Sequence, residues 1–309
     1  MKWVDSQGYA LRDSGLHNIQ SRKKLAERLL ISSSRLKRLT DGKDRYRCWT
    51  EPKKNGGVRE IEAPLDDLKE VQSRISDLLK RVKAPDYLMA PVKGRSYVDN
   101  AAAHVGARAF HLLDIEDFFP SCTEKRVFWF FNSVMRCSVD VAATLARLAT
   151  RNGRLPQGSP CSPILAFYAY FDMWETINTI VEDGQCRLSL YADDLTISGA
   201  CIREADIWKI KRTLQKYGHR YNRDKERAII NRAADITGVI VKDDVLLLPN
   251  RQHKALAAAR RKRGIAGSDK ERTAIDRQIR GRIAQAGQIT RHLEKNAREL
   301  CQGSTSDPE

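Results

Sequence analysis

The chain has 309 residues, and 41% of them are hydrophobic, which is enough to build a sizeable buried core. Lys and Arg number 55 against 39 Asp and Glu, so the net charge at pH 7 is +16. A surplus this large favours a polyanionic partner, either a nucleic acid or an anionic membrane surface. No segment approaches the ~18 apolar residues that a membrane span needs, and residues 1–15 lack the apolar centre of a secretory signal. The composition therefore excludes membrane-spanning, small secreted and wholly disordered proteins.

Cysteine and histidine usage argues against disulfide and zinc chemistry. The seven cysteines are odd in number and no two form a C-x-x-C pair, while the six histidines form no H-x₃₋₅-H pair. This pattern favours reduced thiols in a reducing compartment, so we expect a cytoplasmic protein.

The N-terminal part of the chain predicts two helices with a hairpin between them. Leucines recur at helical spacing in the basic segment 19–30, and apolar residues do the same in 65–82. Asn55-Gly56 lies between alternating residues and is typical of a tight β-hairpin turn.

A buried strand is predicted over residues 109–115, a mostly apolar segment that ends with Asp114 and Ile115. The segments 124–135 and 138–149 follow with helical periodicity. Ser121 lies at capping-box spacing before the first of these helices, so we expect it to be the N-cap.

A Gly- and Pro-rich loop over residues 155–163 precedes another predicted helix. Ser162 is the expected N-cap and Pro163 the first helical residue, and the helical pattern continues to residue 181. Residues 204–217 predict a further helix, with Gly218 suited to the position after its end.

Two hairpins are predicted in the second half of the chain. The first spans residues 186–198, where two apolar strands flank Asp193 and Asp194 at the tip. The second comprises strands at 236–241 and 245–248. From residue 251 onward the chain reads as helical and strongly basic, with an apolar face and a basic face, and residues 302–309 are expected to fray.

The acidic pair at the tip of the first hairpin suggests metal chemistry. Most Asp-Asp pairs are solvated turns or helix starts, but Asp193 and Asp194 follow an apolar strand, where adjacent carboxylates repel each other and a divalent cation relieves that repulsion. Asp114 would add a third carboxylate if its strand is an antiparallel neighbour of the hairpin. Two ions ~3.5–4 Å apart on such a site would activate a 3′-hydroxyl and stabilise a leaving pyrophosphate.

Three motifs, in the same order along the chain, resemble those of reverse transcriptases. Residues 191–194 (Tyr-Ala-Asp-Asp) resemble the YADD signature, residues 113–121 the first catalytic motif, and residues 155–160 the nucleotide-pocket loop of that family. The resemblance extends over residues 45–250. It implies a right-hand polymerase that carries out RNA-directed DNA synthesis by a two-metal mechanism.

Two further elements resemble those of bacterial retron reverse transcriptases. Residues 100–104 match an N-A-x-x-H element, and residues 236–238 match a V-T-G element with Ile in place of the usual Val. This likeness implies synthesis of a branched RNA–DNA hybrid (msDNA) from a cognate noncoding RNA, primed from a guanosine 2′-hydroxyl and used in antiphage defence. The alternatives are a group II intron or diversity-generating reverse transcriptase, and a non-catalytic protein that binds structured RNA.

The resemblance also implies roles for individual residues. Asp114, Asp193 and Asp194 would be catalytic and would bind the metal ions. Phe119 resembles the aromatic residue that excludes a ribose 2′-hydroxyl, with plain core packing as the alternative. The other expected nucleotide-binding residues are Arg59, Asp117, Gln157, Gly158 and Lys225. The expected RNA-binding residues are Arg277, Arg280, Arg291, Lys295 and Arg298.

These observations predict an α+β right-hand polymerase with an antiparallel palm sheet. We expect an N-terminal helical extension at 1–44, fingers and palm at 45–248, and a basic helical thumb with a frayed tail at 249–309. The expected cofactor is a pair of Mg²⁺ ions, with Mn²⁺ as the alternative. The expected partners are the cognate RNA, which is both template and primer, its DNA product, deoxynucleoside triphosphates, a toxin or effector protein and a host ribonuclease H, with no membrane.

Overall fold

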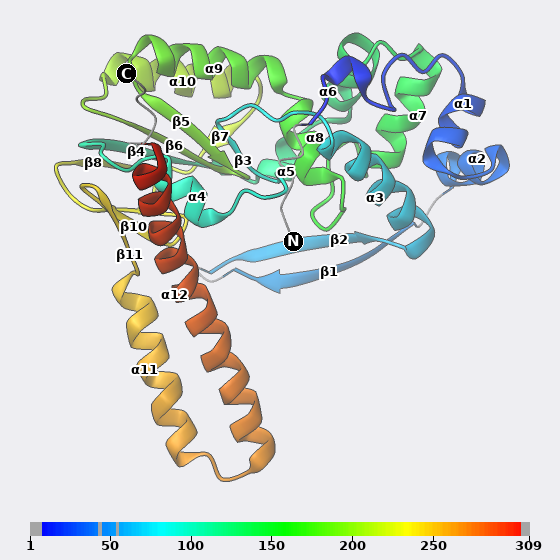
Figure 1. The fold of residues 1–309 in the computed structure, drawn as a ribbon. Coiled ribbons are helices and arrows are strands. Elements are labelled where there is room, and N and C mark those ends of the chain that lie inside the picture. The colour runs from blue at the N-terminus through cyan, green and yellow to red at the C-terminus, as the bar shows by residue number, and fades with distance from the viewer. Residues whose placement is uncertain (1–7, 43–44, 54–55, 304–309) are drawn as a thin grey trace.

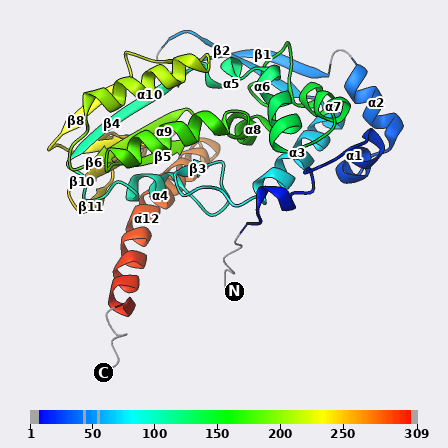
Figure 2. The same ribbon diagram turned by 90° about the horizontal axis from the view of Figure 1, so that it is seen from above.

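The computed structural model describes residues 8–42, 45–53 and 56–303, and these residues form an α+β fold with the outline of a hand (Figures 1 and 2). A mainly antiparallel sheet occupies the centre, a cluster of helices with a β-hairpin lies beside it, and a two-helix arm projects away from both (Figure 1). In the described part of the chain, no helix combines the length and apolar character needed to cross a bilayer. The predicted fold class is confirmed.

The central sheet has the strand order β3-β5-β6-β4-β7, and β8 also pairs with β4. The β3–β5 pair is parallel and the other pairs are antiparallel. The hairpin predicted at 186–198 forms β5 and β6, which share this sheet with β4. The bounds are β3 (Leu88–Ala90), β4 (Ala109–Glu116), β5 (Arg187–Tyr191), β6 (Asp194–Gly199), β7 (Arg220–Tyr221) and β8 (Arg227–Ile230).

Successive residues of a strand point to opposite faces of the sheet, and each face here is covered by different elements. Leu113 of β4 and Ile197 of β6 belong to the large core beneath α9 (Phe171–Asp183) and α10 (Glu204–Lys216) (Figure 1). Phe110 of β4 belongs to a second, smaller core on the other face. That smaller core also takes side chains from α4 (Tyr97–Ala102), β9 (Ala234–Ile236), β10 (Val239–Lys242) and β11 (Val245–Leu247).

The predicted Asn-Gly hairpin forms β1 (Tyr46–Pro52) and β2 (Val58–Pro64), which pair from Tyr46 opposite Pro64 to Pro52 opposite Val58. Helices pack beside this hairpin and share the large core with the sheet. They are α1 (Arg22–Leu29), α2 (Ser33–Asp41), α3 (Asp66–Lys80), α6 (Glu124–Trp129), α7 (Val139–Ala149) and α8 (Ser162–Tyr168), with short helical turns at Leu11–Asp13 and α5 (Phe118–Ser121).

The C-terminal arm consists of α11 (Asn250–Ile265) and α12 (Asp269–Gly303), which lie side by side (Figure 1). The return helix α12 reaches the central body, where Ile289 is buried in the smaller core. This agrees with the helical tail expected from residue 251 onward. The predicted fraying of 302–309 falls largely outside the described residues.

Two predicted helix caps are wrong. Thr123, not Ser121, caps α6, because its side chain accepts from the Arg126 backbone N–H, while the Ser121 hydroxyl instead bonds Phe118 O at 2.7 Å. The N-cap of α8 is Cys161, because Ser162 is already helical and its hydroxyl donates to Pro156 O at 2.8 Å.

Three predicted elements are divided. The helix expected to run to residue 181 breaks between α8 and α9, at Ala169 and Tyr170. The helix expected at 124–135 continues after α6 as a π-helical segment, Phe130–Val134. The strand expected at 236–241 spans β9 and β10, because Thr237 and Gly238 both adopt positive φ and turn the chain between them.

Candidate active site

Strand pairing brings the three predicted carboxylates together at one end of the central sheet. In the antiparallel register of β4 and β6, Asp114 lies directly opposite Asp194. Asp193 immediately precedes β6, and its backbone oxygen accepts a hydrogen bond from the Ile115 N–H at 2.9 Å. The sheet thus places Asp114 beside the hairpin tip, as the sequence argument required.

The hairpin turn itself is conformationally unusual. Tyr191 pairs with Asp194, so only Ala192 and Asp193 connect the strands. Ala192 has φ 57°, a left-handed conformation that is uncommon for residues other than glycine. Such backbone conformations concentrate at functional sites, where the surrounding structure imposes them.

Burial and mutual repulsion disfavour the charged forms of the paired carboxyls. Burial raises the pKa of Asp194 to about 7, and the charges of Asp193 and Asp114 add to this rise. Burial also raises the pKa of Asp193, with a smaller contribution from Asp114. This site would therefore gain stability from a bound cation.

Lys225 supplies one such positive charge. Its Nζ lies 2.7 Å from Asp114 Oδ1, and this hydrogen bond is the main cause that raises the Lys225 pKa. The ammonium also acts on the neighbouring carboxyls, since its charge lowers the pKa of both Asp193 and Asp194. The structure thus places Lys225, an expected nucleotide-binding residue, against the carboxylate cluster.

The donor chemistry suits a hard divalent cation. Among the described residues, no group of three or more His, Cys, Asp or Glu side chains is arranged as a ready metal cage. Three clustered carboxylates nevertheless present only oxygen donors, which Mg²⁺ prefers, and a divalent ion would relieve the repulsion that contributes to the raised pKa values of Asp193 and Asp194. The residues present therefore fit a divalent cation. Asp114, Asp193 and Asp194 would hold it, and it would compete with the Lys225 ammonium, which lies 2.7 Å from Asp114 Oδ1.

The β1–β2 hairpin faces this cluster. Arg59 on β2 is exposed, and its charge lowers the pKa of Asp193 across the gap. Lys53 of the same hairpin lies 3.4 Å from Asp117 Oδ1, and Asp117 itself adopts φ 44° just after β4. Positive charge from the hairpin therefore projects toward the end of the sheet that carries the carboxylates.

Phe119 lies on the short turn α5, five positions after Asp114 in the chain. Its ring is partly buried against the large core, with its centroid 5.6 Å from that of Phe118. The partial exposure is compatible with the predicted contact to a nucleotide sugar, and the packing is compatible with the plain structural alternative.

The loop that carries Gln157 and Gly158 is pinned to β2. The Glu62 N–H donates to Gln157 O at 2.7 Å, and Gly158 adopts φ +130°. A Cβ on Gly158 would lie 3.1 Å from Glu62 O. The absence of a side chain at Gly158 thus allows this loop to lie close to the backbone of β2.

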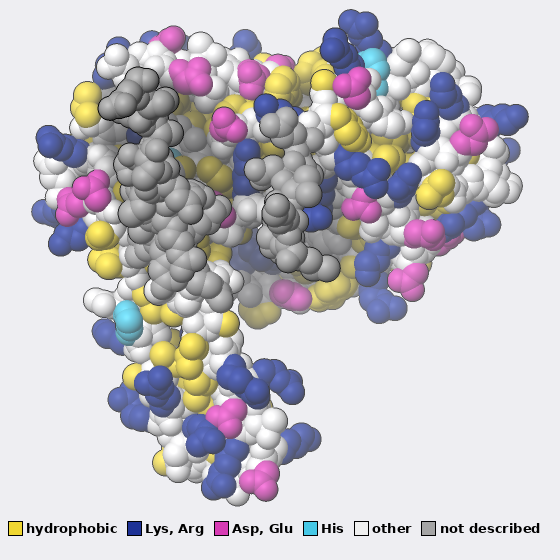
Figure 3. Space-filling model, viewed as in Figure 1, with side chains coloured by type: hydrophobic (Ala, Val, Ile, Leu, Met, Phe, Trp, Pro, Cys, Tyr) yellow, Lys and Arg dark blue, Asp and Glu magenta, His cyan; other side chains and the backbone are white. Residues whose placement is uncertain are grey.

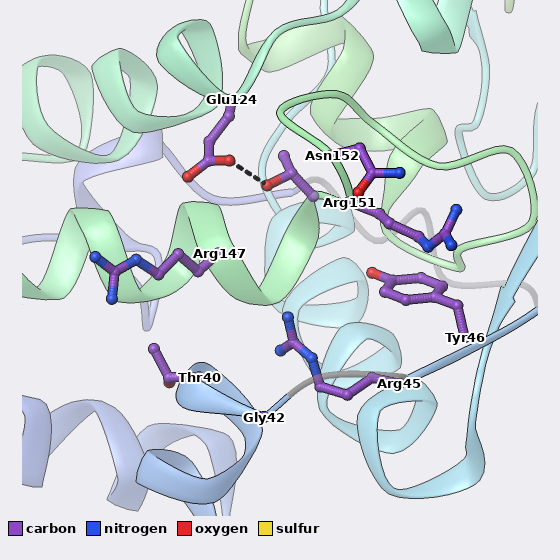
Figure 4. Close-up of a pocket in the computed structure, with 9 residues that line it drawn as sticks. Thr40, Gly42, Arg45, Tyr46, Glu124, Arg147, Arg151 and Asn152 are labelled. Carbon is purple, nitrogen blue, oxygen red and sulfur yellow. Dashed lines mark hydrogen bonds between the residues drawn. The ribbon is translucent and has the colours of Figure 1, made fainter.

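A polar pocket of about 460 Å³ lies behind this loop, and sequence reasoning did not identify it (Figure 4). Arg151 stands at its edge near the Tyr46 ring and forms an ion pair with the buried Glu62 carboxylate. This pair anchors the strand that holds Gln157. The pocket is lined by Thr40, Gly42, Arg45, Tyr46, Glu124, Arg147, Thr150, Arg151 and Asn152.

The predicted RNA-binding residues all fall on α12. Arg277 and Arg280 are exposed on the arm, whose visible surface carries many Lys and Arg side chains (Figure 3). The side chains of Arg291, Lys295 and Arg298 lie outside those that the structure describes. The RNA-binding role of all five residues stays a prediction.

The sequence argument left Asn100 and His104 without a role, and the structure gives both of them partners. His104 bonds Ser189 and Ser198, and Asn100 bonds Thr237. Two sequence features could have indicated these contacts: the two retron-like elements, and the serines that alternate with apolar residues in β5 and β6.

These features define a right-hand polymerase. The sheet with carboxylates on adjacent antiparallel strands is the palm, the basic β-hairpin facing them belongs to the fingers, and the projecting helical arm is the thumb. Residues 51–241 match the family described as "Reverse transcriptase (RNA-dependent DNA polymerase)". The match covers more than half of the chain, which belongs to the reverse transcriptase family.

Curated relatives confirm the resemblance to retron enzymes. The retron Se72 reverse transcriptase of Salmonella heidelberg is 35% identical over 48% of this chain and 39% of its own length. The retron Mx65 reverse transcriptase of Myxococcus xanthus is 33% identical over 63% of this chain and 51% of its own length. The retron Ec86 reverse transcriptase of Escherichia coli is 30% identical over 63% of this chain and 62% of its own length. The matches thus cover 39% to 62% of the length of these relatives. A solved structure of Candida tropicalis telomerase aligns with a TM-score of 0.49 and 12% identity, covering 66% of this chain and 55% of that one.

Proposed function

We propose that this protein is an RNA-directed DNA polymerase that extends a primer 3′-hydroxyl along an RNA template. The observation that carries the proposal is the pairing of Asp114 with Asp194 across β4 and β6, beside Asp193 in the turn. Family membership supports the same reaction. Intact carboxylates at all three positions argue against a palm that only binds RNA.

In the proposed reaction, the 3′-oxygen forms a new bond to the α-phosphorus of a deoxynucleoside triphosphate. The bond from that phosphorus to the bridging oxygen breaks, and pyrophosphate leaves. Asp114, Asp193 and Asp194 would hold two Mg²⁺ ions, which supply activation of the attacking hydroxyl and neutralisation of the leaving group.

The surrounding residues would bind and orient the nucleotide. Arg59, whose charge acts on Asp193, would pair with the triphosphate, while Lys225 would move from Asp114 to the leaving phosphates. Gln157 would line the pocket floor. The ring of Phe119 would occupy the space that a ribose 2′-hydroxyl needs, which selects deoxynucleotides.

The likeness to retron enzymes supports a narrower proposal. The template and primer would be one cognate noncoding RNA, with synthesis starting from a guanosine 2′-hydroxyl and giving a branched RNA–DNA product. Its biological use would be antiphage defence together with an effector protein, and a host ribonuclease H would trim the template. We assign 1–44 to an N-terminal extension, 45–248 to fingers and palm, and 249–309 to a thumb that holds the RNA.

The test is incorporation of labelled nucleotides by the purified chain with its adjacent genomic noncoding RNA. A reverse transcriptase of the proposed kind should give a DNA product joined to RNA by a 2′–5′ linkage that debranching enzyme releases. DNA joined only to an ordinary 3′ end would support polymerisation but reject the retron-type priming. Products made only on a DNA template would reject RNA-directed synthesis.

A further inference from the structure

The retron-like elements, which the mechanism leaves unused, meet in space beside the catalytic hairpin. One element begins at Asn100 near the end of α4 and ends at His104, just after that helix, and the other forms the turn between β9 and β10 that contains Thr237. Both lie on the face of the sheet that carries Asp194, because Asp194 and Ser198 are four residues apart on one strand and so point the same way.

His104 joins the two strands that bear the hairpin tip. Its Nδ1 lies 2.7 Å from Ser198 Oγ on β6, and its Nε2 lies 2.7 Å from Ser189 Oγ on β5. All three residues are 0% exposed. Burial lowers the pKa of His104 to about 4, so the ring is neutral at pH 7, with one nitrogen donating to a serine and the other accepting from one.

This bridge runs diagonally across the two strands. Ser189 lies opposite Thr196, two residues from the Tyr191–Asp194 pair, and Ser198 lies opposite Arg187, four residues from that pair. The ring therefore joins levels about 7 and 13 Å along the strands from the tip. Hydrogen bonds to both strands fix their relative height and twist across this diagonal. Because the turn contains only Ala192 and Asp193, the strands transmit that geometry to the tip.

The other end of α4 contacts the thumb. The Tyr97 hydroxyl donates to Gln285 O of α12 at 3.2 Å, and Ile289 of α12 packs in the smaller core with Val98 of α4. Thr237 completes the connection, since its hydroxyl donates to Tyr97 O at 3.0 Å and accepts from Asn100 Nδ2 at 3.2 Å.

We infer that His104 is a positioning residue for Asp193 and Asp194, and that α4 couples the thumb helix to the catalytic hairpin through it. The inference rests on the proposed function for the chemistry that the hairpin performs. The N-A-x-x-H and T-G elements are then two halves of one hydrogen-bonded unit, with the asparagine fixing the turn and the histidine fixing the strands.

The test compares His104→Leu, which removes both bonds, with His104→Gln, whose amide can still donate and accept. Single-nucleotide addition on a generic RNA template with a DNA primer gives kcat, and Mn²⁺ titration calorimetry gives metal affinity without any need for polymerisation. Removal of groups that orient metal ligands typically costs 10–100-fold. His104→Leu should lower kcat and Mn²⁺ affinity by about tenfold each, with primer–template Kd changed less than twofold, and His104→Gln should restore most of the loss.

Val141→Ala is the matched control for lost stability, because Val141 is a buried side chain of α7, away from the sheet. It should lower the Tm without changing kcat or Mn²⁺ affinity. If His104→Leu does not fold, Ser198→Ala removes one of the two bonds and should give a smaller loss in the same direction.

Unchanged kcat and Mn²⁺ affinity in a folded His104→Leu or Ser198→Ala protein would overturn the inference, as would equal losses in Val141→Ala. If the wild type does not extend primers but His104→Leu still weakens Mn²⁺ binding, the proposed function fails and the positioning role stands.

Discussion

Proton binding at the carboxylate cluster should make the magnesium requirement depend on pH. Burial, followed by the charges of Asp193 and Asp114, raises the pKa of Asp194 to about 7. A metal ion can take this carboxylate as a ligand only after the proton has left, so protons compete with the metal. Affinity for Mg²⁺ should therefore fall as the pH drops through 7 and level off above it.

The size of the effect follows from that pKa. For one competing proton, the apparent dissociation constant is multiplied by 1 + 10^(pKa − pH), which with a pKa of about 7 is roughly eleven at pH 6 and close to one at pH 8. The half-saturating Mg²⁺ concentration should thus rise about tenfold from pH 8 to pH 6. The raised pKa of Asp193 acts in the same direction.

The assay is single-nucleotide addition at saturating primer–template and nucleotide, with Mg²⁺ titrated at several pH values. The half-saturating concentration is the relevant quantity, because the maximal rate also reflects ionisation of the attacking hydroxyl. Primer–template binding at each pH serves as the control. Calorimetry in two buffers should in addition report about half a proton released per metal-loaded site near pH 7. A constant Mg²⁺ requirement with no proton release would refute the reasoning.

Three further predictions concern the nucleotide sugar, the loop glycine and the thumb. Phe119→Val should raise ribonucleotide incorporation relative to deoxynucleotide incorporation by roughly 10–100-fold, since a steric clash costs about 1–3 kcal/mol. If competitive extension shows the same ratio of the two as in the wild type, Phe119 only packs against the core. Gly158→Ala should lower the urea unfolding free energy by about 1–3 kcal/mol and weaken nucleotide binding, because a φ of +130° is strained for a residue with a side chain and the added Cβ would crowd Glu62 O at 3.1 Å. Wild-type values for both quantities would contradict this. The double variant Arg277→Gln, Arg280→Gln should bind the cognate RNA more weakly, and the slope of log binding constant against log salt concentration should fall by up to about two. Nucleotide addition on a saturating generic primer–template should be retained. If salt-titrated RNA binding matches the wild type, these arginines are solvent-exposed and do not contact RNA.

The elements that the sequence predicts well are those with a strong local pattern. The strand that ends at Asp114, the Asp193–Asp194 hairpin and the Asn-Gly hairpin all follow from apolar runs and turn residues, and their pairing brings the carboxylates together. The two-helix arm likewise follows from periodicity.

The missed features depend on contacts between distant parts of the chain. The short strands β7 and β8 have little pattern of their own and exist because β4 offers an edge. Ser121 lost its expected capping role because His219, 98 positions away, and Phe118 O take its hydroxyl. The His104 bridge joins residues 85 and 94 positions apart. Spacing in the sequence cannot reveal such bonds, because the fold alone brings these residues together.

The most direct test of the central claim is DNA synthesis on an RNA template by the wild type, Asp193→Asn and Glu116→Gln. Asp193 belongs to the carboxylate cluster, whereas Glu116 is an exposed acid two residues beyond Asp114 on the same strand. The wild type and Glu116→Gln should extend the primer in the presence of Mg²⁺. Asp193→Asn should bind the same RNA but lose more than about 10³-fold in rate, because a neutral amide does not replace the charge of a metal ligand. Robust Mg²⁺-dependent extension by Asp193→Asn would contradict the assignment of the active site.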